Sequence, residues 1–232
     1  MLNKKSSFLG TLFISYSMEL NNINEIAEAL QKLLAGQKPG QSAHEKMIPK
    51  GRLLVPNSPI PARQSAVMLL LYPKNGQIYF PLIRRPVYDG MHSGQMAFPG
   101  GKHESGDANL IQTAIRECCE EVGVCLNKLE ILGTLTEIYI QVTHYQVLPV
   151  VGILQEAPTF KLDTNEVDAV FEIPLIEILN PQLKKTENWN LRGTQVDVPF
   201  YLLGNQKVWG ATAMILGEFE EVLKTEESKK ME

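Results

Sequence analysis

The chain has 232 residues, of which 44% are hydrophobic and 21% are charged, an ordinary balance for a globular protein with one sizeable core. Its formal net charge of -4 argues against nucleic acid as a partner, because surfaces that neutralise phosphates need clustered Lys and Arg. No apolar stretch is long enough to span a bilayer, so no membrane partner is expected.

The N-terminal part is predicted to be an addition to one main domain. Residues 1–17 are interpreted as an overlong start or a leader, because a second Met follows them. An amphipathic helix is predicted at residues 22–35, followed by a linker or lid at residues 36–49 in which little can be buried. The predicted organisation is leader, helix and linker at 1–50, the main domain at 51–223, and a charged, frayed tail at 224–232.

Apolar runs and turn signals predict the elements of the main domain. Residues 65–72 and 78–83 flank Asn75-Gly76, a dipeptide typical of tight hairpin turns. The other predicted elements are strands at 129–139, 146–154, 200–203 and 207–209 and helices at 175–180 and 211–223. This mixture predicts an α+β fold built in layers.

An acidic helix is predicted at residues 108–122, with Asp107 as its N-cap and Gly123 ending it in a left-handed conformation. Apolar residues recur along one face at the helical period, so that face is expected to meet the core. Three carboxylates share a separate face, because they lie three and four positions apart. We expect these three, Glu117, Glu120 and Glu121, to converge on one spot.

This concentration of negative charge predicts a bound cation. Like charges at helical spacing destabilise a bare helix by roughly 0.2–0.5 kcal/mol per pair. Arg116 can reach Glu120, but excess negative charge remains that Mg²⁺ or Mn²⁺ would neutralise. The alternative is a solvated acidic face. The upstream pair Gly100-Gly101 favours a site, because backbone there can approach a metal or phosphate closely.

The cysteines are an odd number packed into eight positions: Cys118, Cys119 and Cys125. Adjacent helix positions diverge by about 100°, so we expect reduced thiols. Buried small side chains are favoured over a metal-thiolate cluster. Reduced thiols predict a cytoplasmic location.

The glycine turn and the acidic helix together match a known motif. The pattern Gly, acid, Arg-Glu-x-x-Glu-Glu-x-Gly-aliphatic resembles the Nudix box of hydrolases acting on nucleoside diphosphates linked to another moiety. Asp107 stands in place of Glu, and eight residues rather than seven separate it from Arg116. That departure resembles the coenzyme A pyrophosphatase branch, as do residues 82–85 and 92–101. The resemblance covers about residues 50–222 and implies a Nudix-type α/β/α sandwich with a mixed central sheet and a metal-binding helix.

The resemblance also implies roles for the acidic residues. Glu117 and Glu121 are expected to be the principal metal ligands, with Glu120 as a third ligand or as the group polarising the attacking water. Arg116 would orient this cluster. Glu166 lies in a predicted loop and is the candidate general base, with a solvated loop carboxylate as the alternative.

Four further residues are expected to contact the metal or the substrate. Gly101 would offer a main-chain group to the metal, and Gly100 would approach the substrate. Arg84 and Arg85 follow a predicted strand, where one could bind the 3′-phosphate that distinguishes coenzyme A from simple ADP compounds. A solvated strand end is the alternative for both arginines.

The predicted activity is divalent-metal-dependent hydrolysis of the pyrophosphate bond of coenzyme A or its thioesters, giving a phosphopantetheine-type product and adenosine 3′,5′-bisphosphate. The alternative enzyme is a Nudix pyrophosphatase for ADP-ribose, dinucleotides or nucleotide sugars, because the metal helix would be unchanged. A Nudix-fold module that binds without hydrolysing is disfavoured, because all three glutamates are present. A homodimer is expected.

Overall fold

The computed structural model describes residues 22–51, 59–90, 92–125, 128–191 and 193–230, with side chains placed as far as residue 224. The predicted leader at residues 1–17 and the predicted start of the main domain near Arg52 lie outside these residues. No helix within the described residues is both long and apolar enough to cross a membrane.

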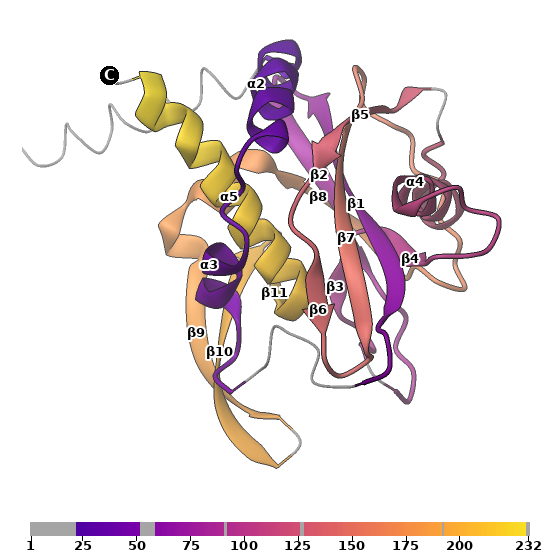
Figure 1. Cartoon of the computed structure of the whole chain (residues 1–232), viewed down its shortest axis with the longest axis vertical. Coiled ribbons are helices and arrows are strands. Elements are labelled where there is room, and N and C mark those ends of the chain that lie inside the picture. The colour runs from indigo at the N-terminus through magenta and orange to yellow at the C-terminus, as the bar shows by residue number, and fades with distance from the viewer. Residues whose placement is uncertain (1–21, 52–58, 91, 126–127, 192, 231–232) are drawn as a thin grey trace, which may run out of the picture.

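An eight-stranded mixed sheet forms the centre of the molecule (Figure 1). Its middle strand, β1 (Arg63–Lys74), pairs antiparallel with β2 (Gln77–Arg84) and parallel with β7 (Tyr145–Ile153). The other strands are β3 (Met96–Ala97) and β8 (Ala169–Pro174) on β2, β4 (Gly100–Lys102) on β1, and β5 (Glu130–Thr134) and β6 (Ile138–Ile140) on β7. The predicted α+β fold with a mixed central sheet is therefore confirmed.

The β1–β2 hairpin forms as the sequence predicts. Asn75 and Gly76 both adopt positive φ, at 51° and 72°, which matches the twist of the flanking strands. The turn aligns Tyr72 with Tyr79 across the pair. β2 thereby ends at Arg84, beside the glycine-rich segment that leads to the acidic helix.

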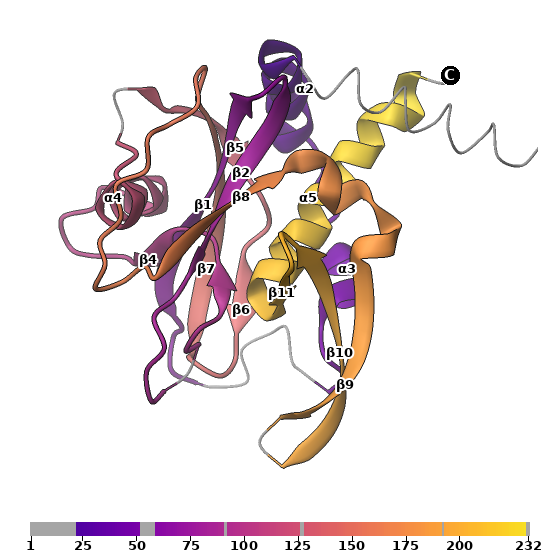
Figure 2. The ribbon, with the colours of Figure 1, turned by 180° about the vertical axis from the view of Figure 1, so that it is seen from behind.

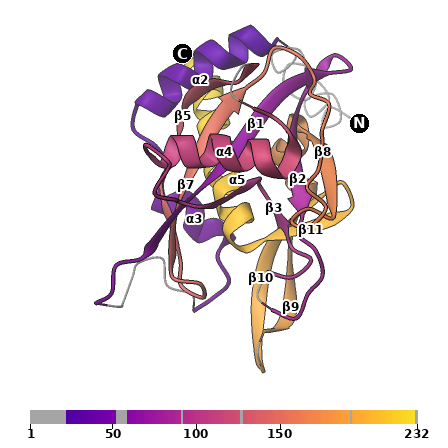
Figure 3. The ribbon, with the colours of Figure 1, turned by 90° about the vertical axis from the view of Figure 1, so that its right-hand side faces the viewer.

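Helices cover both faces of the sheet, as Figure 3 shows with α4 (Leu110–Val122) across the front and α5 (Gly210–Lys230) behind. Successive residues of β1 alternate between these layers. Met68 and Leu70 pack with Ala114 and Cys118 of α4, and the intervening Leu69 packs in the core cluster that includes residues of α5. This alternation follows from the two-residue period of a strand.

The N-terminal segment packs on the second layer. Asn22 caps α2 (Ile23–Ala35), confirming the predicted helix. The expectation that the following linker buries little is wrong, because α3 (Gln41–His44) and the 3₁₀ turn η1 (Glu45–Met47) place Ala43, His44 and Met47 inside. The sequence did not predict this burial, because the few apolar residues of this polar segment do not recur at the period of a helix or a strand.

A second sheet with three antiparallel strands projects from the body (Figures 1 and 2). It consists of β9 (Lys184–Leu191), β10 (Thr194–Leu203) and β11 (Gln206–Trp209). The predicted β10–β11 hairpin is confirmed, with positive φ at Gly204 and Asn205. The sequence did not predict β8 or β9. β9 is largely exposed and polar, so it lacks the apolar alternation that signals a strand.

Two predicted helical regions differ in extent or type. Residues predicted as a helix after Pro174 form the 3₁₀ turns η3 (Leu175–Leu179) and η4 (Pro181–Leu183). The predicted frayed tail instead continues α5 to Lys230. Its Lys and Glu residues are good helix formers, and Lys224 forms an ion pair with Glu220 one turn back, at 2.6 Å.

Candidate active site

The N-cap of the acidic helix α4 differs from the predicted one. Asn109, not Asp107, is its N-cap, because the Asn109 Oδ1 atom accepts the Gln112 N–H at 3.0 Å. Asn is as good a cap as Asp, so the sequence held a signal for it. At the other end Gly123 adopts φ 77° and ψ 15°, which confirms the predicted left-handed termination.

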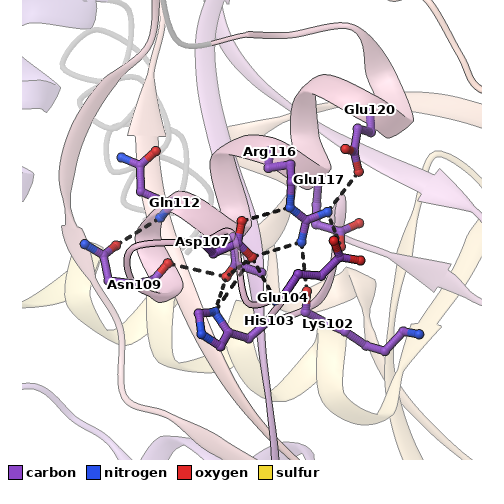
Figure 4. A network of polar contacts seen from close by, with 10 residues as sticks. Lys102, His103, Glu104, Asp107, Asn109, Gln112, Arg116, Glu117 and Glu120 are labelled. Atoms are coloured by element: carbon purple, nitrogen blue, oxygen red, sulfur yellow. Dashed lines mark hydrogen bonds and ion pairs between the residues drawn. The ribbon is translucent and has the colours of Figure 1, made fainter.

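Asp107 is free to bind Arg116 instead (Figure 4). Its two carboxylate oxygens accept from the Nε and Nη2 atoms of Arg116 at 2.9 and 3.1 Å. Thr113 Oγ1 and the Glu104 N–H donate to the same carboxylate. The hydrogen bonds from Arg116 hold the pKa of Asp107 well below its usual range, so this carboxylate stays charged and fixes the guanidinium.

The fixed guanidinium then reaches the acidic face of α4. Arg116 Nη1 lies 3.0 Å from Glu117 Oε1 and 2.9 Å from Glu120 Oε2. Its Nη2 atom also donates to the Lys102 carbonyl. Arg116 therefore links the Lys102 carbonyl to two of the three glutamates.

The structure brings Glu166, rather than Glu120, to the other two glutamates. One carboxylate oxygen from each of Glu117, Glu121 and Glu166 lies within 4.8 Å of the others. Glu117 and Glu121 are buried and Glu166 is exposed. The carboxylate of Glu120 is exposed and is bound to Arg116, outside this group. The group of three joins α4 to the loop that precedes β8.

Gly100 and Gly101 both lie against this group. The Gly100 N–H donates to Glu121 Oε2 at 2.7 Å, which holds that carboxylate against the turn. A Cβ on Gly101 would overlap the carboxylate of Glu117. Gly101 thus allows the buried Glu117 carboxylate to lie directly on the backbone, where a side chain would exclude it.

The electrostatics of the group suit a divalent cation. Burial raises the pKa of Glu121 to about 7 and also raises that of Glu117, because each charged form is poorly solvated there. Several carboxylate oxygens with unsatisfied negative charge are the ligands that Mg²⁺ and Mn²⁺ prefer. The residues present therefore fit a hard divalent ion.

The two predicted substrate arginines have different environments. Arg84 Nε is 2.6 Å from Asp168 Oδ2, and its guanidinium lies over the Phe171 ring, 5.5 Å from the centroid. Within the described residues the guanidinium of Arg85 has no hydrogen bond or ion pair. Its positive charge acts to lower the pKa of Glu121, against the effect of burial. Arg85 is the arginine left available beside the glutamates.

The prediction of three reduced thiols is wrong for two of them. Cys119 and Cys125 form a disulfide, with their Cα atoms 4.5 Å apart. The prediction considered adjacent helix positions, but Cys125 lies beyond Gly123, where the chain turns back onto the end of α4. Cys118 is free and buried, as expected, and burial raises the pKa of its thiol to about 12. The disulfide removes the cysteine argument for a cytoplasmic location.

Comparison with known proteins gives the family. The NUDIX domain model matches residues 62–194. Proteins called uncharacterized Nudix hydrolase NudL from Salmonella paratyphi B and Salmonella newport are each 37% identical over 158 residues, covering 67% of this chain and 80% of theirs. The crystal structure of RenU, a Nudix hydrolase from M. smegmatis, is 15% identical with a TM-score of 0.48, covering 78% of this chain and 96% of that one. The NUDIX domain of Shewanella oneidensis NrtR, complexed with ADP ribose, is 20% identical with a TM-score of 0.42, covering 54% of this chain and 80% of that one. The chain therefore belongs to the NUDIX family and is a Nudix pyrophosphohydrolase.

Proposed function

We propose that this Nudix pyrophosphohydrolase uses Mg²⁺ or Mn²⁺ to hydrolyse the pyrophosphate bond of coenzyme A or its thioesters. The products are a phosphopantetheine-type compound and adenosine 3′,5′-bisphosphate. The observation that carries the activity is the group of three carboxylate oxygens within 4.8 Å at the glycine turn. The coenzyme A specificity is supported by the likeness of the variant box to that branch and by the available Arg85 beside the group.

Glu117, Glu121 and Glu166 would hold the divalent ion, together with a main-chain group of Gly101. When bound, such an ion neutralises the phosphoryl oxygens and acidifies a water molecule. Arg116 keeps Glu117 oriented, since its guanidinium is itself fixed by Asp107. Glu120 borders the group, and its role as a further ligand or as the group polarising water stays a prediction.

Glu166 is proposed both as a metal ligand and as the general base. Its exposed carboxylate lies within reach of the buried pair, where it can hold the ion or accept a proton from the attacking water. The exposed side of the site admits solvent, which the hydrolysis requires. The general-base role proposed from its loop position and the ligand role both need this carboxylate beside Glu117 and Glu121.

Arg85 is proposed to bind a phosphate of the substrate. A guanidinium offers five donors in a fork that suits phosphate oxygens, and this one has no competing partner among the described residues. Arg84 is held by Asp168 and is proposed to position the end of β2. Arg85 lies close enough to Glu121 for its charge to lower the pKa of that carboxylate, so a phosphate bound to Arg85 would lie near the carboxylate group.

A substrate panel tests this function. Coenzyme A, acetyl-coenzyme A, dephospho-coenzyme A and ADP-ribose are assayed with Mg²⁺ and with Mn²⁺, and products are identified by mass. We expect coenzyme A to exceed dephospho-coenzyme A about tenfold in kcat/KM, because a hydrogen bond to a charged group contributes roughly 1.5–3 kcal/mol. Higher turnover of ADP-ribose would favour the alternative pyrophosphatase and contradict the coenzyme A assignment.

Two variants and a matched control sharpen the panel. Arg85→Ala should remove the preference for coenzyme A over dephospho-coenzyme A, and Lys185→Ala, on the exposed strand β9, should preserve it. Glu121→Gln should abolish most turnover of every substrate. An equal loss on both coenzymes in Arg85→Ala would contradict a 3′-phosphate contact.

The cellular setting and assembly are also proposals. A cytoplasmic location is expected from the substrate, which the enzyme would meet there, and it no longer rests on the cysteines. A homodimer is expected from the fold class. Fractionation and sedimentation of the full chain test the two expectations separately.

A further inference from the structure

The loop that carries Glu166 is attached directly to the end of the metal helix. The last carbonyls of a helix have no partner within the helix. In α4, Val122 O accepts the Lys161 N–H at 3.0 Å, and Glu121 O accepts the Asp163 N–H at 3.0 Å. The same residue, Glu121, thus offers its side chain to the carboxylate group and its main chain to the loop.

Asp163 also builds the turn that aims Glu166. Its Oδ1 atom accepts both the main-chain N–H and the Nδ2 of Asn165, each at 2.9 Å. Its carbonyl accepts the N–H groups of Glu166 at 3.1 Å and of Val167 at 2.8 Å. Val167 is buried and packs in the same core cluster as α4. The turn is therefore fixed at both ends, with Glu166 exposed at its edge.

The fit between loop and helix end is close. A Cβ on Gly123 would lie 2.9 Å from Lys161 Cβ and 3.1 Å from Lys161 O. The left-handed glycine that ends α4 therefore also admits the loop. α4 carries two of the three carboxylates, Glu117 and Glu121. Through its bond to Asp163 it also fixes the loop that carries the third, Glu166.

We infer that Asp163 is a positioning residue, whose side chain fixes the turn that holds Glu166 at the metal group. The inference rests on the proposed function only in taking the group as a divalent-metal site. Asp163 does not touch the ion or the substrate in this assignment. It acts through Glu166, so replacing Asp163 should not change the metal affinity of a protein in which Glu166 can no longer bind the ion.

A double-mutant cycle tests the inference on the full chain. Mn²⁺ affinity is measured by electron paramagnetic resonance of the free ion, for Asp163→Ala, Glu166→Gln and the double variant. We expect Asp163→Ala to weaken Mn²⁺ binding about tenfold, as for partners that orient metal ligands. The double variant should bind no more weakly than Glu166→Gln alone, because the two changes remove one interaction.

Conservative and control variants separate positioning from folding. Asp163→Asn keeps the Oδ1 acceptor and should bind Mn²⁺ within about twofold of wild type. Asn165→Ala removes one of the two side-chain bonds and should give a smaller loss that also disappears in the Glu166→Gln background. Glu156→Ala, an exposed carboxylate in the same β7–β8 connection, is the matched control and should leave Mn²⁺ affinity unchanged.

The outcomes distinguish this inference from the proposed function. Additive losses in the double variant, or wild-type Mn²⁺ affinity in folded Asp163→Ala, would overturn the positioning role even if coenzyme A is hydrolysed. A non-additive cycle supports the role even if the substrate panel shows no turnover, because Mn²⁺ binding needs no substrate. Thermal melting of each variant in the absence of metal shows which losses come from unfolding.

Discussion

Gly100 and Gly101 are adjacent, but a side chain at each would meet a different obstacle. Gly100 has φ 153°, and a Cβ there would overlap the Ala66 carbonyl and the backbone of Val67 in β1. Gly101 is not in the left-handed region, and the three atoms nearest its Cβ would all belong to the carboxylate of Glu117. One glycine is therefore required by the sheet and the other by the site.

We expect Gly101→Ala to fold but to lose divalent-metal affinity, because the new methyl group displaces the Glu117 carboxylate from the group of three. The loss should be at least about tenfold, as for a disturbed metal ligand. Titration calorimetry with Mn²⁺ measures it, alongside thermal melting without metal.

Gly100→Ala is the comparison for this change. It should lower the melting temperature or prevent folding, because the clash is with backbone that cannot rotate away. If Gly101→Ala bound Mn²⁺ as wild type does, the overlap with Glu117 would have no functional meaning.

At the scale of elements, the end of α4 is held by a covalent link as well as by its glycine cap. The Cys119–Cys125 disulfide closes a loop with a sequence separation of six around Gly123. Closing a short loop restricts the unfolded chain and contributes about 2 kcal/mol in the chain-entropy account. Cys119 precedes Glu120 and Glu121 directly in the chain, so the disulfide stabilises the last helical turn of α4, which carries both glutamates.

We expect Cys125→Ser to lower the free energy of unfolding by about 2 kcal/mol, measured by urea denaturation without reductant. A reductant should lower the stability of wild type by a similar amount. It should leave Cys125→Ser unaffected, because that variant has no disulfide between Cys119 and residue 125 for the reductant to break. A reductant that destabilised both proteins equally would show that the effect does not come from this disulfide.

Elements with strong local signals could be predicted from the sequence. The β1–β2 hairpin carries Asn75-Gly76, and α4 combines an apolar face with a terminating Gly123, so period and turn chemistry agree there. β9 and the packed linker could not be predicted. β9 is ordered by its hydrogen bonds to β10, and polar strands formed by pairing leave no apolar pattern in the sequence.

For the candidate site, too, the sequence predicted the residues on one helix but not the contacts made by a distant loop. Spacing on one helix placed Glu117 and Glu121 together, because helical geometry is fixed. The same spacing predicted that Glu120 joins them, but Arg116 binds the Glu120 carboxylate outside the group. Glu166 reaches the group through a loop docked on the end of α4 by main-chain bonds. Asp163, whose side chain fixes the turn before Glu166, carries only the weak signal of an Asx turn.

At the scale of the whole molecule, one buried carboxylate joins three separate parts of the chain. Glu218 on α5 is fully buried and accepts from His44 Nε2 at 2.9 Å and from the Gly40 N–H at 3.1 Å. It also accepts from Thr136 Oγ1 at 2.6 Å, between β5 and β6. The N-terminal segment is thereby held to the sheet and to α5 by a charge that water does not solvate.

These contacts predict how stability depends on pH. Burial acts to raise the pKa of Glu218, but hydrogen bonds from His44 and Thr136 outweigh it, and the pKa lies below its ordinary value. A lowered folded-state pKa contributes stability that is present above the unfolded pKa, near 4.5, and is lost as pH falls through the folded value. The contribution should therefore be complete at pH 7 and decline in acid.

We expect Glu218→Gln to lower the free energy of unfolding by about 2–3 kcal/mol at pH 7, because a buried hydrogen-bonded charge is replaced by an amide that cannot satisfy every donor. The difference from wild type should narrow as pH falls from 5 to 3, when wild-type Glu218 takes up a proton. Urea denaturation across this range measures both curves. Glu156→Gln, exposed and outside the network, should follow wild type throughout. A difference that stayed constant or widened in acid would mean that the charge of Glu218 does not hold the N-terminal segment in place.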